Sequence, residues 1–263
     1  MPAGSLTDRG ENLLLQYIFN DVALPAIDPH FGLATSATPT DSTFTEMTGS
    51  GYARVQIDNT YFSASTTGST SNTLEISFPR STGFTGTVFG IGLFEDDTQT
   101  TPLVYWETPD QETIVDGNAF SLPSGSVNFS FDPSSKFSTY LQNLIINWLF
   151  RGEAWTITNV SFSIGYCTTA PTASAFGTEP AGGSGYSQKT ISRSAIQFPI
   201  TGNVATWDVD LTFDTATADQ GSVQHIGYFD GAQFLAWGET SSPLTINTNG
   251  SLTVGTGTTF TLN

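Results

Sequence analysis

Hydrophobic residues recur at helical spacing in two similar octets, NLLLQYIF at Asn12–Phe19 and NLIINWLF at Asn143–Phe150. Residues three and four positions apart lie on one face of a helix, so both octets predict amphipathic helices that need a partner surface. The buried stripe of the first helix is expected at Leu14, Tyr17 and Ile18. The stripe of the second is expected at Phe137, Tyr140, Leu141, Leu144, Ile145, Trp148 and Leu149.

Polar residues and a glycine mark where these helices should begin and end. Asp8, with Glu11 three residues later, has the spacing of a capping box for the first helix. Ser134 or Ser135 can cap the second helix. Gly152 follows its last apolar residues and is the expected stop.

Alternating apolar and polar segments follow each helix, and they occur in the same order in both halves of the chain. Such alternation predicts half-buried strands. The matched segments are FGLATSATPT (31–40) with IGYCTTAPT (164–172), GSGY (49–52) with GSGY (183–186), LEISF (74–78) with VDLTF (209–213), IGLFED (91–96) with IGYFDG (226–231), LVYWET (103–108) with FLAWGET (234–240), and IVDGNAFSL (114–122) with INTNGSLTV (246–254).

Seven matched segments in one order, the helical octets included, indicate a tandem duplication. The predicted units are residues 1–132 and 133–263. Each would be one amphipathic helix followed by about seven short strands, a pattern typical of a β-sandwich. The fold class is therefore mainly β, with two tandem jelly-roll-like sandwich domains, each preceded by a helix. The Asp-Gly and Asn-Gly pairs in the last matched segments predict hairpins.

Composition and charge restrict the partners. The chain has 263 residues, 38% of them hydrophobic, and carries 24 acidic against 7 basic residues for a net charge of −17. Such a charge repels phosphate backbones and anionic lipid heads, so neither nucleic acid nor a membrane surface is an expected partner. The N-terminal sequence MPAGSLTDRGEN lacks the basic and apolar regions of a secretory signal. Cys167 is the single cysteine and is expected to be a buried hydrophobic residue.

Residues with catalytic potential form no recognised constellation. His30 and His225 lie at unmatched places in the two halves, and metal-binding, nucleophile and phosphate-loop motifs are missing. The carboxylate groups at 95–97 and 208–210 are expected to be solvated, although a Ca²⁺ site at the first group stays open. The sequence therefore predicts a protein that is not an enzyme and needs no cofactor.

The aromatic residues offer one alternative function. Trp106 and Trp237 are interpreted as equivalent core residues of the two halves, but an aromatic face on a β domain can also bind a sugar ring. Tyr105 and Tyr228 should point the other way and be more exposed. A carbohydrate-binding receptor module is therefore a second functional hypothesis.

The motifs of the first half resemble those of small tailed-bacteriophage proteins usually described as tail fibre or virion structural proteins. The shared segments are GYARV (51–55), NTLEISFP (72–79) and FGIG (89–92). The second half departs from this pattern, with SQK (187–189) in place of ARV. The resemblance implies a structural protein of the phage particle surface, and it brings no catalytic residues.

Two roles in the particle are consistent with that resemblance. The protein is a component of the tail fibre or baseplate, or it is a decoration protein that braces the capsid. Both imply other virion proteins as partners and multiple copies with homo-oligomeric contacts. The candidate packing and assembly residues are Tyr17, Ile18, Trp106, Trp148, Leu149 and Trp237. The second helix lies between the units, so it is expected to dock them rigidly.

Overall fold

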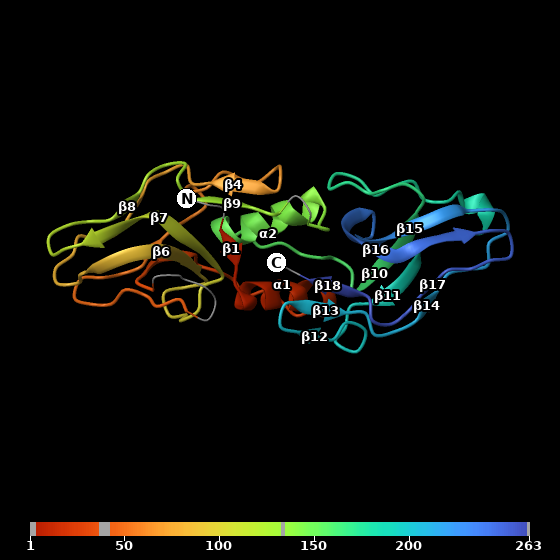
Figure 1. Cartoon of the computed structure of the whole chain (residues 1–263), viewed down its shortest axis with the longest axis horizontal. Helices are drawn as coiled ribbons and strands as arrows, with labels where there is room; N and C mark the ends of the chain where they lie inside the picture. The colour runs from red at the N-terminus through yellow and green to blue at the C-terminus, as the bar shows by residue number, and fades with distance from the viewer. Residues whose placement is uncertain (1–3, 37–42, 133–134, 262–263) are drawn as a thin grey trace.

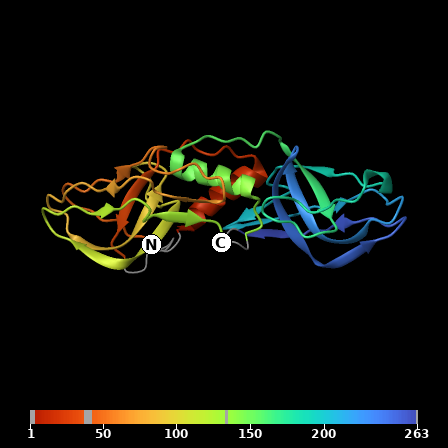
Figure 2. The ribbon, with the colours of Figure 1, turned by 90° about the horizontal axis from the view of Figure 1, so that it is seen from above.

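The structure is a computed structural model that describes residues 4–36, 43–132 and 135–261. The body is elongated, with strands at both ends and two helices between them (Figures 1 and 2). The strands of the first half of the sequence form one end, here called the first lobe. Those of the second half form the other end, the second lobe. The protein is mainly β with several antiparallel sheets, as the sequence predicts. Packing of these sheets as jelly-roll-like sandwiches stays a prediction.

Two helices contain the predicted octets: α1 spans Asp8–Asn20 and α2 spans Thr139–Arg151. The predicted N-terminal caps are wrong. The N-cap of α1 is Thr7, whose hydroxyl accepts a hydrogen bond from the Gly10 amide at 3.1 Å. The N-cap of α2 is Ser138, which accepts from the Leu141 amide at 3.2 Å.

The reason for these cap positions lies in the sheets. The hydroxyls of Thr7 and Ser138 also donate to the carbonyl oxygens of Pro102, just before β7, and of Phe234 in β16, both at 2.6 Å. The point where the chain leaves the sheet therefore fixes the cap. Ser135 lies three residues before the cap of α2, and Ser134 lies outside the described residues. The predicted stop is confirmed, because Gly152 caps α2 in the left-handed region with φ of 63°.

The first lobe consists of one large sheet and two small ladders. The large sheet has the order β1-β7-β6-β2-β3, and the ladders are β4-β9 and β5-β8. Its strands are β1 (Ser5–Leu6), β2 (His30–Ala34), β3 (Val55–Gln56), β4 (Ser69–Ser71), β5 (Ile76–Ser77), β6 (Gly86–Phe94), β7 (Val104–Ile114), β8 (Ser121–Leu122) and β9 (Asn128–Ser130).

The second lobe repeats this arrangement. Its large sheet has the order β11-β10-β15-β16, and its smaller sheets are β12-β13-β18 and β14-β17. A 3-10 helix, η1, spans Gly182–Ser184. Its strands are β10 (Ser161–Cys167), β11 (Lys189–Ser192), β12 (Ile200–Thr201), β13 (Val204–Thr206), β14 (Leu211–Thr212), β15 (Gly221–Asp230), β16 (Gln233–Ile246), β17 (Thr253–Val254) and β18 (Thr259–Thr261).

The two lobes share one strand order. Strands β10, β15 and β16 pair as β2, β6 and β7 do, and the bridge from Phe137 to Ala236 stands where β1 pairs with β7. The order of strands is thus the one that a duplication predicts. The division into domains 1–132 and 133–263 stays a prediction, because both helices reach from one lobe into the other.

The predicted hairpins at the Asp-Gly and Asn-Gly pairs are wrong. Strand β8 pairs with β5, and β17 pairs with β14, so neither pairs with the strand that precedes its turn. The turns at Gly117 and Asn249 instead carry the chain from the large sheet to a small ladder. The flanking alternation is correct, but it is satisfied by strands that are distant in sequence.

Each helix begins on its own lobe and ends in the core of the other. The ring of Phe19, at the end of α1, packs against rings of the second lobe. The ring of Phe150, at the end of α2, packs against rings of the first. The partners of Phe19 are Phe162, Phe198, Tyr228 and Phe260, and those of Phe150 are Phe62, Trp106 and Phe129. The helices are therefore exchanged reciprocally between the lobes.

Arginines complete both exchanged helix ends. Arg193, fully buried in the second lobe, donates to the carbonyl oxygens of Tyr17 and Ile18 and pairs with Asp21 at 2.9 Å. Arg151, in the last turn of α2, donates to the carbonyl oxygen of Phe62 in the first lobe at 2.7 Å. A cation at a helix C-terminus also opposes the helix dipole. Burial is the main cause that lowers the pKa of Arg193.

Replacing Arg193 with Met should lower the free energy of unfolding by about 3 kcal/mol, because buried carbonyl oxygens and the end of α1 lose their charged donor. Urea denaturation followed by circular dichroism measures this change. Arg80→Met is the matched control, since Arg80 is exposed and its replacement should change stability by less than about 0.5 kcal/mol. Equal effects of the two substitutions would contradict the capping role.

Candidate functional site

The predicted packing residues of the helices lie at the junction of the two lobes. Ile18 and Leu149 are buried. The Tyr17 hydroxyl donates to the carbonyl oxygen of Trp155 at 2.9 Å and accepts from the Ile157 amide at 2.8 Å. The Trp148 indole donates to the carbonyl oxygen of Pro25 at 3.2 Å. Each helix thus binds the loop that follows the other helix, which links the lobes in both directions.

Tyr140 corrects the predicted stripe of α2. It is 42% exposed and faces away from the junction, whereas Ile146 and Phe150 are buried. The rest of the predicted stripe is buried at Phe137, Leu141, Ile145, Trp148 and Leu149, and Leu144 is half-buried. The stripe widens at the C-terminal end of α2, where the other lobe surrounds the helix.

The repeated GSGY segments position a tyrosine over a strand glycine in each lobe. The Tyr52 hydroxyl accepts from the Leu33 amide at 2.9 Å and donates to Glu46 at 2.8 Å. Tyr186 makes the same two contacts, with the Tyr166 amide and Glu179. Burial is the first cause, and the neighbouring glutamate a further one, that raises the pKa of both tyrosines. The tyrosine of the repeated motif thus has a structural role in both lobes, because it links a strand amide to a glutamate.

An arginine binds the glutamate of this tyrosine–glutamate pair in the first lobe, but not in the second. Arg54, from the GYARV segment, holds Glu46 through two hydrogen bonds of 2.8 and 2.6 Å, and its guanidinium lies 3.5 Å from the centre of the Phe94 ring. In the second lobe Gln188 takes this place and donates to Glu179 at 2.9 Å. The substitution seen in the sequence therefore replaces an ion pair with a neutral hydrogen bond.

The strand register corrects the predicted equivalence of the two tryptophans. Gly92 pairs with Tyr105, and its counterpart Gly227 pairs with Trp237. Trp237 therefore corresponds to Tyr105, and Gly238 corresponds to Trp106. Both tryptophans are buried, Trp106 with 1% and Trp237 with 8% of its surface exposed, but they point to opposite faces of their sheets.

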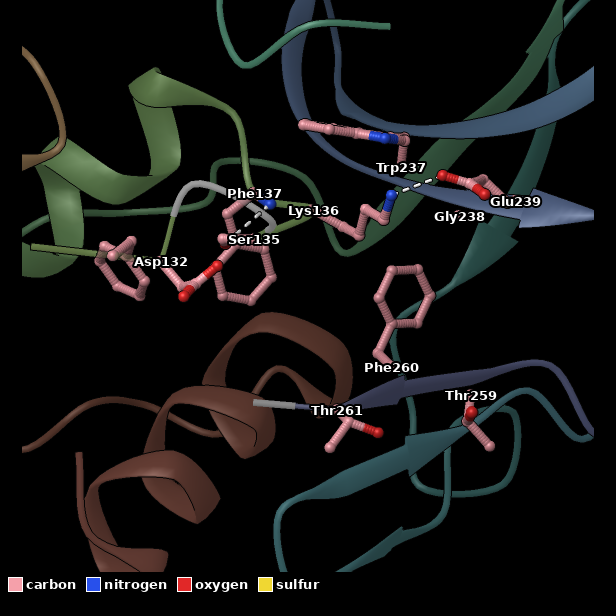
Figure 3. Close-up of a pocket in the computed structure, with 11 residues that line it drawn as sticks. Asp132, Ser135, Lys136, Phe137, Trp237, Gly238, Glu239, Thr259, Phe260 and Thr261 are labelled. Carbon is pink, nitrogen blue, oxygen red and sulfur yellow. Dashed lines mark hydrogen bonds and ion pairs between the residues drawn. The ribbon is translucent and has the colours of Figure 1, made fainter. Parts of the chain in front are cut away.

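A pocket opens beside Gly238 in the second lobe (Figure 3). Its volume is about 570 Å³. Trp237 and Phe260 stand on two sides of it, and an ion pair of 2.5 Å between Lys136 and Glu239 lies between them. Its lining residues are Phe131, Asp132, Ser135, Lys136, Phe137, Trp237, Gly238, Glu239, Thr259, Phe260 and Thr261.

The carboxylate groups do not converge on a cleft. The predicted solvation of Glu95 is wrong, because Glu95 is buried and pairs with Arg9 of α1. The carboxylate of Asp96 accepts hydrogen bonds from Thr98, which are the main cause that lowers its pKa. Asp208 and Asp210 are both exposed, as the alternation predicts. Within residues 4–36, 43–132 and 135–261, no group of three His, Cys, Asp or Glu side chains could hold a metal ion.

The remaining candidates lie apart from one another, and all but the half-buried His225 are buried. His30 is buried in β2, with Nδ1 2.5 Å from the carbonyl oxygen of Asp28, and His225 lies in the other lobe. Burial raises the pKa of the Cys167 thiol to about 11. Tyr228 is 1% exposed, so its predicted exposure is wrong. It corresponds to Leu93 of the first lobe and fills the core around Phe19.

The comparison with protein families decides the relationship. A family model described as Podophage GP4 fiber I protein gp80 matches the chain twice, over residues 5–130 and 136–260. The chain belongs to this family. It is therefore a bacteriophage protein of the virion, as the resemblance implies, and it carries the family's unit in two tandem copies. No curated protein matches the chain. Neither described helix of this fibre-family protein is long and apolar enough to cross a membrane.

Two features of this fibre-family protein escaped sequence reasoning. The role of Arg193 has no local signal, because its partners lie on a helix far away in the sequence. The pocket beside Gly238 does have one. The segment LVYWET (103–108) aligns without a gap with LAWGET (235–240), and both end in Glu-Thr. In this alignment Gly238 occupies the position of Trp106.

Proposed function

We propose that this protein is a structural component of the tail fibre or baseplate region on the virion exterior, where it acts as a rigid strut between other virion proteins. Membership of a phage fibre family supports a virion role. The strut is supported by the reciprocal exchange of α1 and α2, which gives the elongated body one continuous hydrophobic core (Figures 1 and 2). A fixed angle between lobes suits a part that must hold a symmetric appendage.

A structural role, and not catalysis, agrees with how the charged groups are used. Six of the seven basic residues form ion pairs with acidic residues in the described part of the chain. These pairs fix loops and helix ends. The protein is expected to act in several copies, as fibre and baseplate components do by symmetry.

Locating the protein on the particle tests this function. The particles would be imaged by cryo-electron microscopy with and without antibody fragments against the purified chain. We expect antibody density at the tail. Antibody density spread over the capsid faces would instead identify the protein as a decoration protein. If no particle carried antibody density, the protein would not be an exposed part of the virion.

Replacing Trp148 and Leu149 together with Gln should loosen the lobes and reduce incorporation into particles, because both side chains are buried at the junction. Small-angle scattering measures the change as a larger radius of gyration, and immunoblots of purified particles measure incorporation. Tyr140→Gln is the control, since it alters an exposed position on the same helix. An unchanged radius with normal incorporation would show that the junction does not depend on these contacts.

A further inference from the structure

Trp106 fills a defined space in the first lobe. Its indole lies between the rings of Phe31 and Phe150, and its Nε1 donates to the carbonyl oxygen of Asn128 at 2.7 Å. Gly4 lies directly against it, because a Cβ atom at Gly4 would stand 2.3 Å from the ring. This setting shows what the repeated unit encloses when the position carries an indole.

The second lobe keeps part of these surroundings but lacks the indole, and Ile164 stands in the place of Phe31. Gly238 stands in the place of Trp106, and a Cβ atom built on it meets no atom within 4 Å. The positions that touch the indole in the first lobe, Gly4 and Asn128, correspond to Ser135 and Thr259. Both of these residues line the pocket of Figure 3. Part of the pocket is therefore the space that the missing indole leaves, and the rest lies beside Trp237 and Glu239 on the other face of β16.

We propose that this pocket binds a tryptophan side chain presented by a partner protein, which supplies in trans the indole that the second lobe lacks. The aromatic side chains of Phe137 and Phe260 lie on the face of the sheet to which a side chain at position 238 would point, and they suit a flat apolar ring. The volume lies within the range of about 300 to 1,000 Å³ that is usual for ligand pockets. The identity of the partner as another virion protein rests on the proposed function, but the binding site itself does not.

The negative charge of the chain favours basic residues next to the tryptophan of the partner. The chain carries a net charge of −17, and Lys136, the one basic side chain among the described lining residues, is already paired with Glu239. A tryptophan flanked by Lys or Arg is therefore attracted to this surface, whereas one flanked by acidic residues is repelled.

A sugar ring suits the pocket less well. Sugar platforms present an aromatic face openly, whereas Trp237 is only 8% exposed and stacks on Phe234 with 5.7 Å between ring centres. Buried walls on several sides favour an inserted side chain. Sugar binding is nevertheless a distinct outcome that the same experiment detects.

The test titrates the purified full-length chain with the blocked tripeptide Lys-Trp-Lys, by calorimetry and by fluorine NMR of its 5-fluorotryptophan form. We expect saturable binding with a dissociation constant of about 1 mM or tighter. Lys-Ala-Lys should not bind. Glu-Trp-Glu should bind at least tenfold more weakly at low salt, with a smaller difference at high salt.

The substitution Gly238→Trp should fill the pocket from within and weaken Lys-Trp-Lys binding at least tenfold, while raising the melting temperature. Gly182→Trp adds the same side chain at an exposed glycine of the second lobe with open space around it, and it should leave binding unchanged. If Gly238→Trp does not fold, Gly238→Leu provides the same test with a smaller side chain.

Two results would overturn the proposal. One is the lack of saturable Lys-Trp-Lys binding, or binding that folded Gly238→Trp and Gly238→Leu do not weaken. The other is saturable binding of galactose, lost in Gly238→Trp, without binding of the peptide. Because these measurements use the isolated chain, they succeed or fail independently of where the protein lies on the particle.

Discussion

Residues 1–132 produced alone should not form a folded monomer. Without α2, the space that Phe150 occupies between Phe62, Trp106 and Phe129 is empty, and Phe19 at the end of α1 has lost the core that buries it. Each of these losses compares with a buried Phe→Ala substitution, at roughly 3 to 5 kcal/mol. Together they are comparable with the whole stability of an ordinary domain.

Mixing residues 1–132 with residues 133–263 should restore the native state. The two pieces are expected to form a complex of one copy each, with the circular dichroism spectrum of the intact chain and one cooperative thermal transition. Light scattering on a size-exclusion column measures the stoichiometry. At high concentration a half-chain alone is expected to self-associate, by inserting α1 of one copy where α2 belongs in another.

An intact chain with a protease site inserted between residues 132 and 133 is the matched control. Cutting it after folding should leave the spectrum and the elution volume unchanged, because the exchanged helices hold the pieces together. A folded, monomeric half-chain would show instead that each unit can bury its own helix, and the exchange would then be a preference and not a requirement.

The helices were predictable from the sequence, but the surfaces that cover them were not. Their apolar stripes predict two amphipathic helices and a need for partner surfaces, and both helices exist. An apolar stripe does not specify which surface covers it, because hydrophobic contact is not directional. The exchange depends on where Arg193 and the aromatic clusters lie in space. Those positions follow only from the assembled sheets.

The tryptophans show a second limit. Aligning Trp106 with Trp237 looks natural, but successive residues of a strand face opposite sides of a sheet, so a shift of one position reverses every side chain. The shared Glu and Thr after each tryptophan segment carry the correct register. Glu107 and Glu239 indeed pair with equivalent positions of the neighbouring strand, Gly90 and His225.

Replacing Trp106 with Gly should lower the free energy of unfolding by roughly 3 to 5 kcal/mol, with a further loss from the flexible backbone. The indole is almost fully buried and bonded to Asn128, so its removal leaves a cavity and takes away one of the two hydrogen bonds that the Asn128 carbonyl oxygen accepts. Denaturant unfolding of the variant and the parent protein measures the difference. The variant recreates in the first lobe the glycine that the second lobe carries at Gly238.

Free indole should restore part of the lost stability, because it can enter the new cavity and donate to the same carbonyl oxygen. The melting temperature of Trp106→Gly is expected to rise with indole concentration, following the linkage between ligand binding and folding. Leu93→Ala is the control: Leu93 is fully buried in the same lobe, but the cavity it leaves is too small for an indole. A stabilisation by indole that is equal in both variants would mean nonspecific binding. A stabilisation confined to Trp106→Gly would show that the repeated unit encloses an indole-shaped space whether or not the ring is covalently attached, which is the physical premise for a tryptophan entering beside Gly238.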